Sequence, residues 1–341
     1  MSALHPISRI DQEASELYFR GFSATKLAAE RCFEDVVFLL LHGRLPEPAE
    51  SREIREKFRL LQTIEPRQIT GILEEGKKND ARGLVSLAQW LERQKGTTCL
   101  SDRLIRFIAL TPVIIAAEFR YPEQVIQSRE ALDFAANFKW MIDGEELDKV
   151  GGKQLEKCVI LHMDDPNNPS LTALEESFNA GNSFSLLIEA ALNEHIKPHH
   201  HGAGAEVWAM FSRIGEENAV EVYLKGLLAQ GARIFGLGHR IYRTVDPRAI
   251  VLRDILRLRT RKKGMEWWFN MTEMVASVGP RLILEMKNTE VHPNVDLYNG
   301  IVYHTFGFPP ELFTDLFAIA RVAGWMAHIY EWETSRDPSQ Q

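Results

Sequence analysis

Three consecutive histidines stand in residues 198–204, where the sequence reads Pro-His-His-His-Gly-Ala-Gly. Together with His195 they could bind a transition metal, since imidazole is a common metal ligand. Pro198 interrupts the helical spacing between His195 and His199, so we predict no metal site. A histidine at the start of the next helix can instead stay neutral and donate a hydrogen bond to a developing oxyanion. Exposed turn histidines without a chemical role are the alternative.

A second motif occupies residues 236–243 and reads Gly-Leu-Gly-His-Arg-Ile-Tyr-Arg, with Asp-Pro-Arg at 246–248. Ile241 stands where a dinucleotide-binding fingerprint requires its third glycine, so the motif does not indicate that fold. The two glycines allow the backbone to approach a ligand closely. His239 and three nearby arginines predict a site for an anionic substrate that carries a carbonyl. A solvated loop histidine is the alternative.

The third motif, residues 292–300, reads His-Pro-Asn-Val-Asp-Leu-Tyr-Asn-Gly. Taken alone, Asp296 in such a turn predicts a helix cap or an Asx-turn rather than a catalytic group.

The elements that carry these motifs are predicted to be helices. Apolar residues recur at three and four residue intervals in 33–41 and 220–228, and Gly43 follows the first stretch. Asp246 and Pro247 form the N-cap and first position of a helix over 248–258, and Pro310 opens another helix. Alternating apolar and polar residues are scarce, which favours an all-α fold.

Composition narrows the functional class. The 341 residues carry a net charge of -7, with 45% hydrophobic and 26% charged residues, as in soluble globular proteins. This balance does not favour nucleic acid as a partner. Three separated cysteines and no visible secretory signal predict a cytoplasmic protein. The apolar stretch 104–119 contains Arg106, Pro112 and Glu118, so we predict no membrane partner.

Together and in this order, the three motifs resemble those of the citrate synthase family: Pro-x-His-Gly-Gly-Ala, then Gly-x-Gly-His-Arg-x-Tyr with Asp-Pro-Arg, then Pro-Asn-Val-Asp-x-Tyr-x-Gly. The resemblance covers most of the chain, and other matching segments lie at residues 10–11, 18–21, 39–43, 159–162 and 324–328. It implies the all-α citrate synthase fold in a homodimer. A large helical domain would contain residues 1–202 and 302–341, and a small helical domain residues 203–301.

The resemblance also implies roles for individual residues. The catalytic residues would be His200, His239 and Asp296, although His201 remains an alternative to His200. Substrate would be bound by His162, Asp165, Arg248 and Arg321. The coenzyme would be bound by Leu237, Gly238, Arg243 and Asn294. The implied enzyme is an acyltransferase of the tricarboxylic acid cycle, whose acyl group becomes alkyl on transfer.

The implied reaction joins acetyl-CoA, or a short acyl-CoA, to oxaloacetate or another 2-oxo acid and releases coenzyme A. Asp296 would remove the α-proton of the thioester, while neutral His200 would donate to the thioester oxygen. His239 would donate to the ketone of the acceptor. No permanently bound cofactor and no metal are expected, because the coenzyme A thioester is a substrate.

Asp165 departs from the family pattern, because it stands where the His-x-Asp-His motif has its last histidine. A carboxylate there would repel a dicarboxylate acceptor, so an altered acceptor is expected. Arg336, near the end of the sequence, is either a substitute for the family's tail arginine or a solvated residue. Two other functions remain open: a citryl-CoA-type lyase, and a non-catalytic homologue that binds coenzyme A esters.

Overall fold

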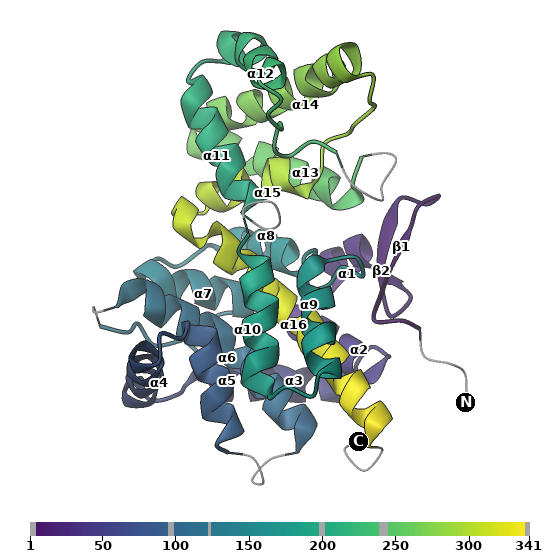
Figure 1. Ribbon diagram of the computed structural model, residues 1–341. Coiled ribbons are helices and arrows are strands. Elements are labelled where there is room, and N and C mark those ends of the chain that lie inside the picture. The colour runs from purple at the N-terminus through teal and green to yellow at the C-terminus, as the bar shows by residue number, and fades with distance from the viewer. Residues whose placement is uncertain (1–4, 95–98, 122–123, 198–201, 239–244, 338–341) are drawn as a thin grey trace. The chain divides into compact units, whose positions relative to one another are not determined.

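The computed structural model describes residues 5–94, 99–121, 124–197, 202–238 and 245–337 (Figure 1). Within them lie sixteen α-helices and one small sheet, so the predicted all-α fold is confirmed. The chain forms two compact units. Unit 1 comprises Met1–Arg9, Tyr18–His195 and Phe317–Gln341, and unit 2 comprises Ile10–Leu17 and Ile196–Leu316. The predicted domain boundaries, 1–202 with 302–341 against 203–301, remain a prediction.

Unit 1 contains ten complete helices and most of an eleventh within the described residues. They are α1 (Ala24–Glu30), α2 (Phe33–His42), α3 (Pro48–Gln62), α4 (Pro66–Lys78), α5 (Gly83–Glu92), α6 (Leu100–Arg120), α7 (Phe134–Asp143), α8 (Lys149–Ile160), α9 (Pro169–Asn179), α10 (Phe184–His195) and α16 (Phe313–Arg336). Helix α2 ends as predicted, because Gly43 adopts a left-handed conformation with φ of 73°.

Helix α16 supplies much of the core of unit 1. The stretch Pro310–Arg336 is long and apolar enough to cross a membrane, but 83% of its most apolar window is buried inside the structure. That burial identifies a core helix of a folded domain. Its predicted start at Pro310 is a short 3₁₀ turn, Pro310–Leu312, and the α-helix begins at Phe313.

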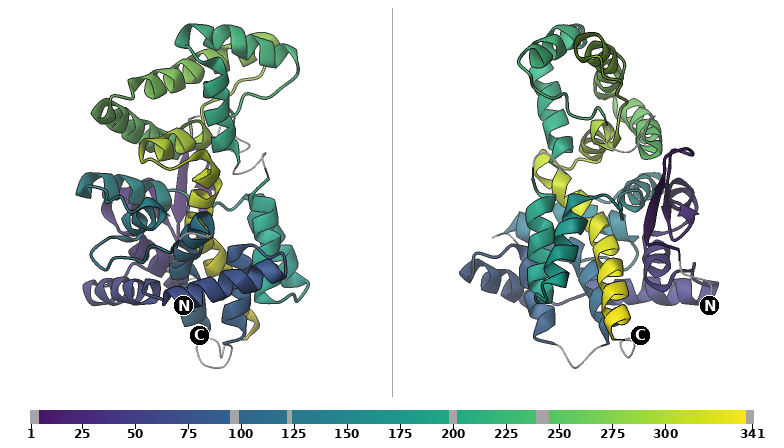
Figure 2. Two further views of the ribbon diagram at one scale, coloured as in Figure 1. Left: turned by 90° about the vertical axis from the view of Figure 1, so that its left-hand side faces the viewer. Right: turned by 45° about the vertical axis from the view of Figure 1, so that its right-hand side comes forward.

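Unit 2 contains five complete helices within the described residues (Figure 2): α11 (Ala203–Ile214), α12 (Val220–Ala229), α13 (Pro247–Lys263), α14 (Glu266–Lys287) and α15 (Val295–Thr305), with a 3₁₀ turn at Glu217–Ala219. Helix α13 begins as predicted, since the Asp246 side chain accepts a hydrogen bond from the Arg248 N–H at 3.0 Å. Helix α15 packs against α11 and α13. This packing places the third motif at the centre of unit 2.

The sequence did not predict the small sheet, which has the order β1 (Ser8–Asp11), β2 (Glu16–Phe19), β3 (Phe22–Ser23). The turn between β2 and β3 places Arg20 and Gly21 at φ values of 49° and 85°. Two left-handed residues are required by a type I′ hairpin turn, where asparagine or aspartate usually precedes glycine. Arg20 is buried and is held there by the carbonyls of His5 and Leu40 and by Glu331.

Candidate active site

The second and third motifs meet in unit 2 as two paired backbone segments. The Gly238 N–H donates to the His292 carbonyl at 2.8 Å, and the Asn294 N–H donates to the Gly236 carbonyl at 3.0 Å. Gly236 has a φ of 82°, and a Cβ at this position would lie 2.7 Å from the Leu297 Cα. Glycine is therefore required at Gly236 by both its conformation and the close approach of the next helix.

Asp296 lies in the first turn of α15, where the helix dipole stabilises a carboxylate. The N-cap is Asn294, whose side-chain oxygen accepts a hydrogen bond from the Asp296 N–H at 2.9 Å. The Asp296 Oδ1 atom accepts a hydrogen bond from the Asn299 Nδ2 atom at 3.2 Å. The carboxylate is half-buried, so it is oriented by protein groups and still accessible to a ligand. These are the properties of a positioned general base.

The described end of the first motif contacts the same helix. A Cβ at Gly204, in the first turn of α11, would lie 2.4 Å from the Asn299 Oδ1 atom. A Cβ at Gly300 would lie 2.5 Å from the Gly204 carbonyl oxygen. Helices α11 and α15 therefore touch through glycine backbone, and described parts of all three motifs surround the start of α15. His200, His239 and Arg243 lie outside the described residues.

Arg248 is held rigidly at the start of α13. Its Nε donates to the Asp246 Oδ1 atom at 3.0 Å, and its Nη2 donates to the Asp246 Oδ2 atom at 2.8 Å. Both side chains are almost fully buried, at 2% and 1% exposure. A buried guanidinium needs such a partner, because an uncompensated charge in the interior is costly. Asp246 thus fixes the orientation of an arginine that was predicted to bind substrate.

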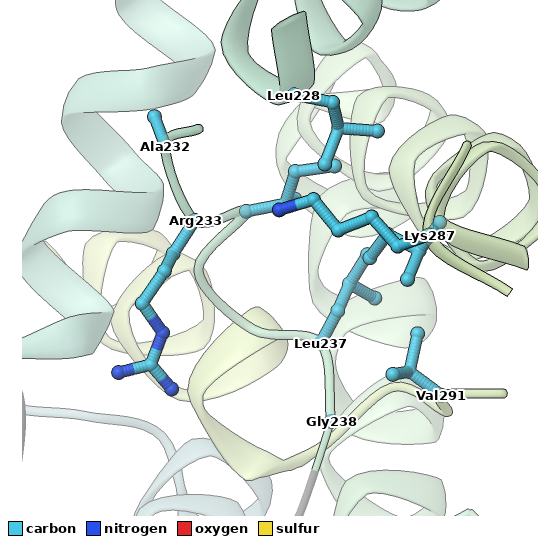
Figure 3. A pocket seen from close by; sticks show the side chains of 9 residues that line it. Leu228, Ala232, Arg233, Leu237, Gly238, Lys287 and Val291 are labelled. Carbon is cyan, nitrogen blue, oxygen red and sulfur yellow. The ribbon is translucent and has the colours of Figure 1, made fainter. Parts of the chain in front are cut away.

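A pocket of about 330 Å³ lies beside the second motif (Figure 3). We call it the coenzyme pocket because two of its lining residues, Leu237 and Gly238, are predicted from the sequence to bind coenzyme. Its lining consists of Leu228, Ala232, Arg233, Ile234, Leu237, Gly238, Ile283, Lys287 and Val291. Figure 3 shows the Lys287 side chain extended toward the segment that carries Arg233, while the Arg233 guanidinium points away from Lys287. An apolar pocket with an ammonium group suits a ligand that has a flat or apolar body and an anionic group.

The predicted coenzyme residues Leu237 and Gly238 both line this pocket. Asn294 lies beside them, because its Nδ2 atom donates to the Gly238 carbonyl at 2.6 Å. The sequence reasoning missed Lys287 and Ile283, which stand four residues apart on α14 and so share one face of that helix. An apolar residue and a lysine four positions apart near the end of a helix, shortly before the third motif, could have indicated that Ile283 and Lys287 line a site.

His162 and Arg321, two predicted substrate residues, lie together in unit 1. The Arg321 Nε donates to the His162 carbonyl at 3.0 Å. The His162 Nδ1 atom lies 2.6 Å from the Cys158 carbonyl, so the proton of the neutral ring is on Nδ1. Both residues are buried. Asp165 is half-buried, and its Oδ1 atom accepts a hydrogen bond from the Asn167 N–H at 3.1 Å.

Asp164 is a structural anchor that the sequence reasoning missed. Its Oδ2 atom accepts hydrogen bonds from the Ser8 hydroxyl at 2.5 Å and from the His328 Nε2 atom at 3.1 Å. Burial raises the pKa of Asp164, but His328, and then Arg321 and Ser8, hold it below its ordinary value. A Cβ at Gly324 would lie 2.4 Å from the Asp164 Oδ1 atom. These contacts fix the loop that carries His162 and Asp165 to α16.

The histidine run 199–201, for which no metal site was predicted, lies outside the described residues. Across the described ranges, no group of three or more His, Cys, Asp and Glu side chains is arranged to hold a metal ion.

Comparison with known proteins gives a consistent result. The family model described as citrate synthase, C-terminal domain, matches residues 2–337. A citrate synthase from Synechocystis sp. is 32% identical over 333 residues, which cover 94% of this chain and 83% of that protein. One from Acidithiobacillus ferridurans is 32% identical over 336 residues, 94% of this chain and 87% of that protein. The crystal structure of Thermotoga maritima citrate synthase superposes with a TM-score of 0.82 at 29% identity, covering 97% of this chain and 89% of that one.

Proposed function

The chain belongs to the citrate synthase family, and from this premise we propose that it condenses acetyl-CoA with oxaloacetate and releases coenzyme A. The observation that carries the proposal is the position of Asp296. It is a half-buried carboxylate at a helix N-terminus, oriented by Asn299, where described parts of three motifs meet. The enzyme would be an acyltransferase whose acyl group becomes alkyl on transfer.

In the proposed mechanism, Asp296 takes a proton from the α-carbon of the thioester. The Asn299 amide orients the carboxylate before the reaction, and the helix N-terminus favours a negative charge there. His200 donates to the thioester oxygen as negative charge develops on it. His239 donates to the ketone oxygen of the acceptor, whose carbon forms the new bond. Water then hydrolyses the thioester and releases the thiol of coenzyme A.

The coenzyme portion of the substrate would occupy the coenzyme pocket. Leu237, Gly238 and the apolar side chains around them would contact its body, and Asn294 would hold the Gly238 segment in place. Lys287 supplies a positive charge for the phosphates, and Arg243 is proposed to supply another. No permanently bound cofactor is needed, because the thioester itself activates the α-carbon.

We keep His162, Arg321 and Arg248 as the proposed acceptor-binding residues, as the family resemblance implies. Asp165 supports a finer version of the proposal, in which a 2-oxo acid other than oxaloacetate is preferred. Its half-buried carboxylate would repel the second carboxylate of oxaloacetate. Loss of one charge-assisted hydrogen bond to the acceptor would change the preference between two acceptors by about 1.5–3 kcal/mol. A short acyl-CoA other than acetyl-CoA as the donor is equally part of this finer proposal.

The test is thiol release from acetyl-CoA and from propionyl-CoA, each with a panel of 2-oxo acids that includes oxaloacetate. The variant Asp296→Asn, which keeps the shape of the side chain, should lose nearly all activity. Asp254→Asn, at an exposed position on α13, is the matched control and should retain it. If Asp296→Asn is as active as the wild-type protein, the proposed general base is wrong.

Two measurements test the alternatives that the sequence left open. Cleavage of added citryl-CoA without net condensation would indicate a lyase. Thermal stabilisation by coenzyme A with no turnover on any acceptor would indicate a non-catalytic binding protein. We further propose that the protein is cytoplasmic and forms a homodimer. Sedimentation equilibrium of the purified chain would test the dimer.

A further inference from the structure

A second pocket, of about 210 Å³, lies in unit 2, and we call it the α11 pocket. It is lined by Glu206, Met210 and Arg213 of α11, by Tyr223 and Leu227 of α12, and by Ala232, Arg233 and Phe235 of the following loop. Its volume is roughly that of seven bulk water molecules, so it has room for a compact organic molecule. The family resemblance assigns no role to its helix-borne residues.

The α11 pocket is chemically asymmetric. Met210, Tyr223, Leu227 and Phe235 give it apolar and aromatic walls. Glu206 and Arg213 are seven residues apart on one helix, which separates them by about 10 Å along its axis. The acidic and basic ends of the pocket are therefore distinct.

The pocket's positive charges are available to a ligand. In the part of the chain that the structure describes, Arg213 and Arg233 form no ion pair or hydrogen bond through their side chains. Two other arginines of unit 2 are paired: Arg253 binds Glu273, and Arg281 binds Glu221 at 2.9 Å. The two guanidinium groups outnumber the single carboxylate, Glu206, among the lining residues, so the cavity favours an anion, and arginine binds carboxylates especially well.

The α11 pocket shares a wall with the coenzyme pocket. Ala232 and Arg233 line both, and the Arg233 guanidinium points away from Lys287 (Figure 3). Gly236 lies three residues after Arg233, and its carbonyl accepts a hydrogen bond from the Asn294 N–H. Asn294 in turn lies two residues before Asp296. A ligand that fixes Arg233 would therefore restrict the segment that forms one side of the coenzyme pocket.

We propose that the α11 pocket is a second ligand site, which binds a small organic anion with an aryl or branched alkyl body and thereby changes the affinity for coenzyme A. The carboxylate of the ligand meets Arg213 and Arg233. Its body lies against Tyr223, Leu227 and Phe235. Coupling between the two ligands is reciprocal, so coenzyme A changes the affinity for the anion by the same factor.

The test uses benzoate as the probe and benzyl alcohol as its uncharged analogue, with calorimetric titration of the full chain. We expect benzoate to bind in the millimolar range, as is usual for a ligand of this size, and to bind more tightly than benzyl alcohol. Arg213→Gln should weaken benzoate binding by about tenfold or more. Arg257→Gln removes an exposed arginine on α13 and should leave binding unchanged.

A second variant, Leu227→Trp, fills the cavity from a half-buried position and should abolish binding while the circular dichroism spectrum stays that of a folded protein. Saturating benzoate should shift the dissociation constant of coenzyme A without blocking its binding. The proposal is overturned if both variants bind benzoate like the wild-type protein, if coenzyme A displaces benzoate completely, or if neither ligand affects the other. The coupling rests on the proposed binding of coenzyme A, so titration with coenzyme A alone comes first; if it does not bind, the proposed function fails, while the benzoate measurements still test the second site.

Discussion

The side-chain amide of Asn294 donates a 2.6 Å hydrogen bond to the Gly238 carbonyl, while its side-chain oxygen caps the helix that carries Asp296. One residue thus connects the glycine loop to the proposed base. Asn294→Ala removes both contacts, and we expect it to lower the free energy of unfolding by about 1 kcal/mol. We expect kcat/KM to fall by more than this loss of stability explains. Asp148→Ala removes the N-cap of α8 in unit 1 and is the control. Equal effects of the two variants on activity would contradict the connecting role of Asn294.

Asn299 should orient the proposed base. Asn299→Ala removes the amide that donates to the Asp296 Oδ1 atom, so kcat should fall by about ten- to a hundredfold, the effect of losing a hydrogen bond to a charged group. The KM for acetyl-CoA should change little, because the amide contacts the base and not the coenzyme pocket. Asn270→Ala, an exposed position on α14, is the control. An unchanged kcat in Asn299→Ala would show that Asp296 needs no such support.

The buried pair of Asp246 and Arg248 predicts non-additive stability effects. Arg248→Met leaves the Asp246 carboxylate buried without its partner, and should cost about 3–5 kcal/mol in urea denaturation. The double variant Asp246→Asn, Arg248→Met removes both charges and should recover much of that stability. It should still lack activity, since the proposed acceptor-binding guanidinium is gone. Simple addition of the two single effects would contradict a direct pair.

Burial raises the pKa of Glu156 in unit 1 to about 8, with a further contribution from the nearby Glu34 carboxylate. A carboxyl whose folded pKa lies above its unfolded value favours folding when protonated. This contribution to stability is complete below the unfolded pKa of 4.5 and is lost as the pH rises toward 8. Glu156→Gln should therefore stabilise the protein more at pH 8 than at pH 5, by at least about 1 kcal/mol.

The Glu156→Gln prediction is checked by thermal denaturation at the two pH values. Glu176→Gln, at an exposed position on α9, is the control and should show no such difference. A Glu156→Gln variant whose stability differs from wild type equally at pH 5 and pH 8 would contradict the raised pKa.

Gly324 should be irreplaceable for a steric reason. Gly324→Ala places a Cβ 2.4 Å from the Asp164 Oδ1 atom, so it should lower the melting temperature and displace the loop that carries His162. Its KM for the acceptor should rise. Gly71→Ala is the matched control, because no atom lies within 4 Å of a Cβ there and alanine favours an exposed helix interior by about 1 kcal/mol. A stabilised Gly324→Ala variant would contradict the close packing.

Local signals in the sequence predicted local structure well. Gly43 after an apolar stripe and Asp246 before Pro247 both mark helix ends where predicted, because caps depend on a few neighbouring residues. The resemblance to citrate synthases is also confirmed. At the third motif, the cap proved to be Asn294 rather than Asp296.

Contacts between distant segments could not be predicted from the sequence. The hydrogen bond between Asp164 and His328 joins residues that are 164 positions apart. The sequence around neither residue indicates which residue it contacts. Lys287 of the coenzyme pocket is an ordinary lysine at the end of a helix until the fold places it opposite Leu237. The Arg20-Gly21 hairpin was missed because its left-handed arginine is stabilised by residues from elsewhere in the chain.

The contact between Gly204 and Gly300 has a consequence for engineering this protein. Backbone atoms have no rotamers, so the spacing of the two helices cannot adapt when nearby side chains are exchanged. A side chain larger than hydrogen at either glycine would therefore push the two helices apart next to Asp296. Combinatorial libraries that seek new acceptors should therefore keep these two glycines fixed, together with Gly236, Asn294 and Asn299.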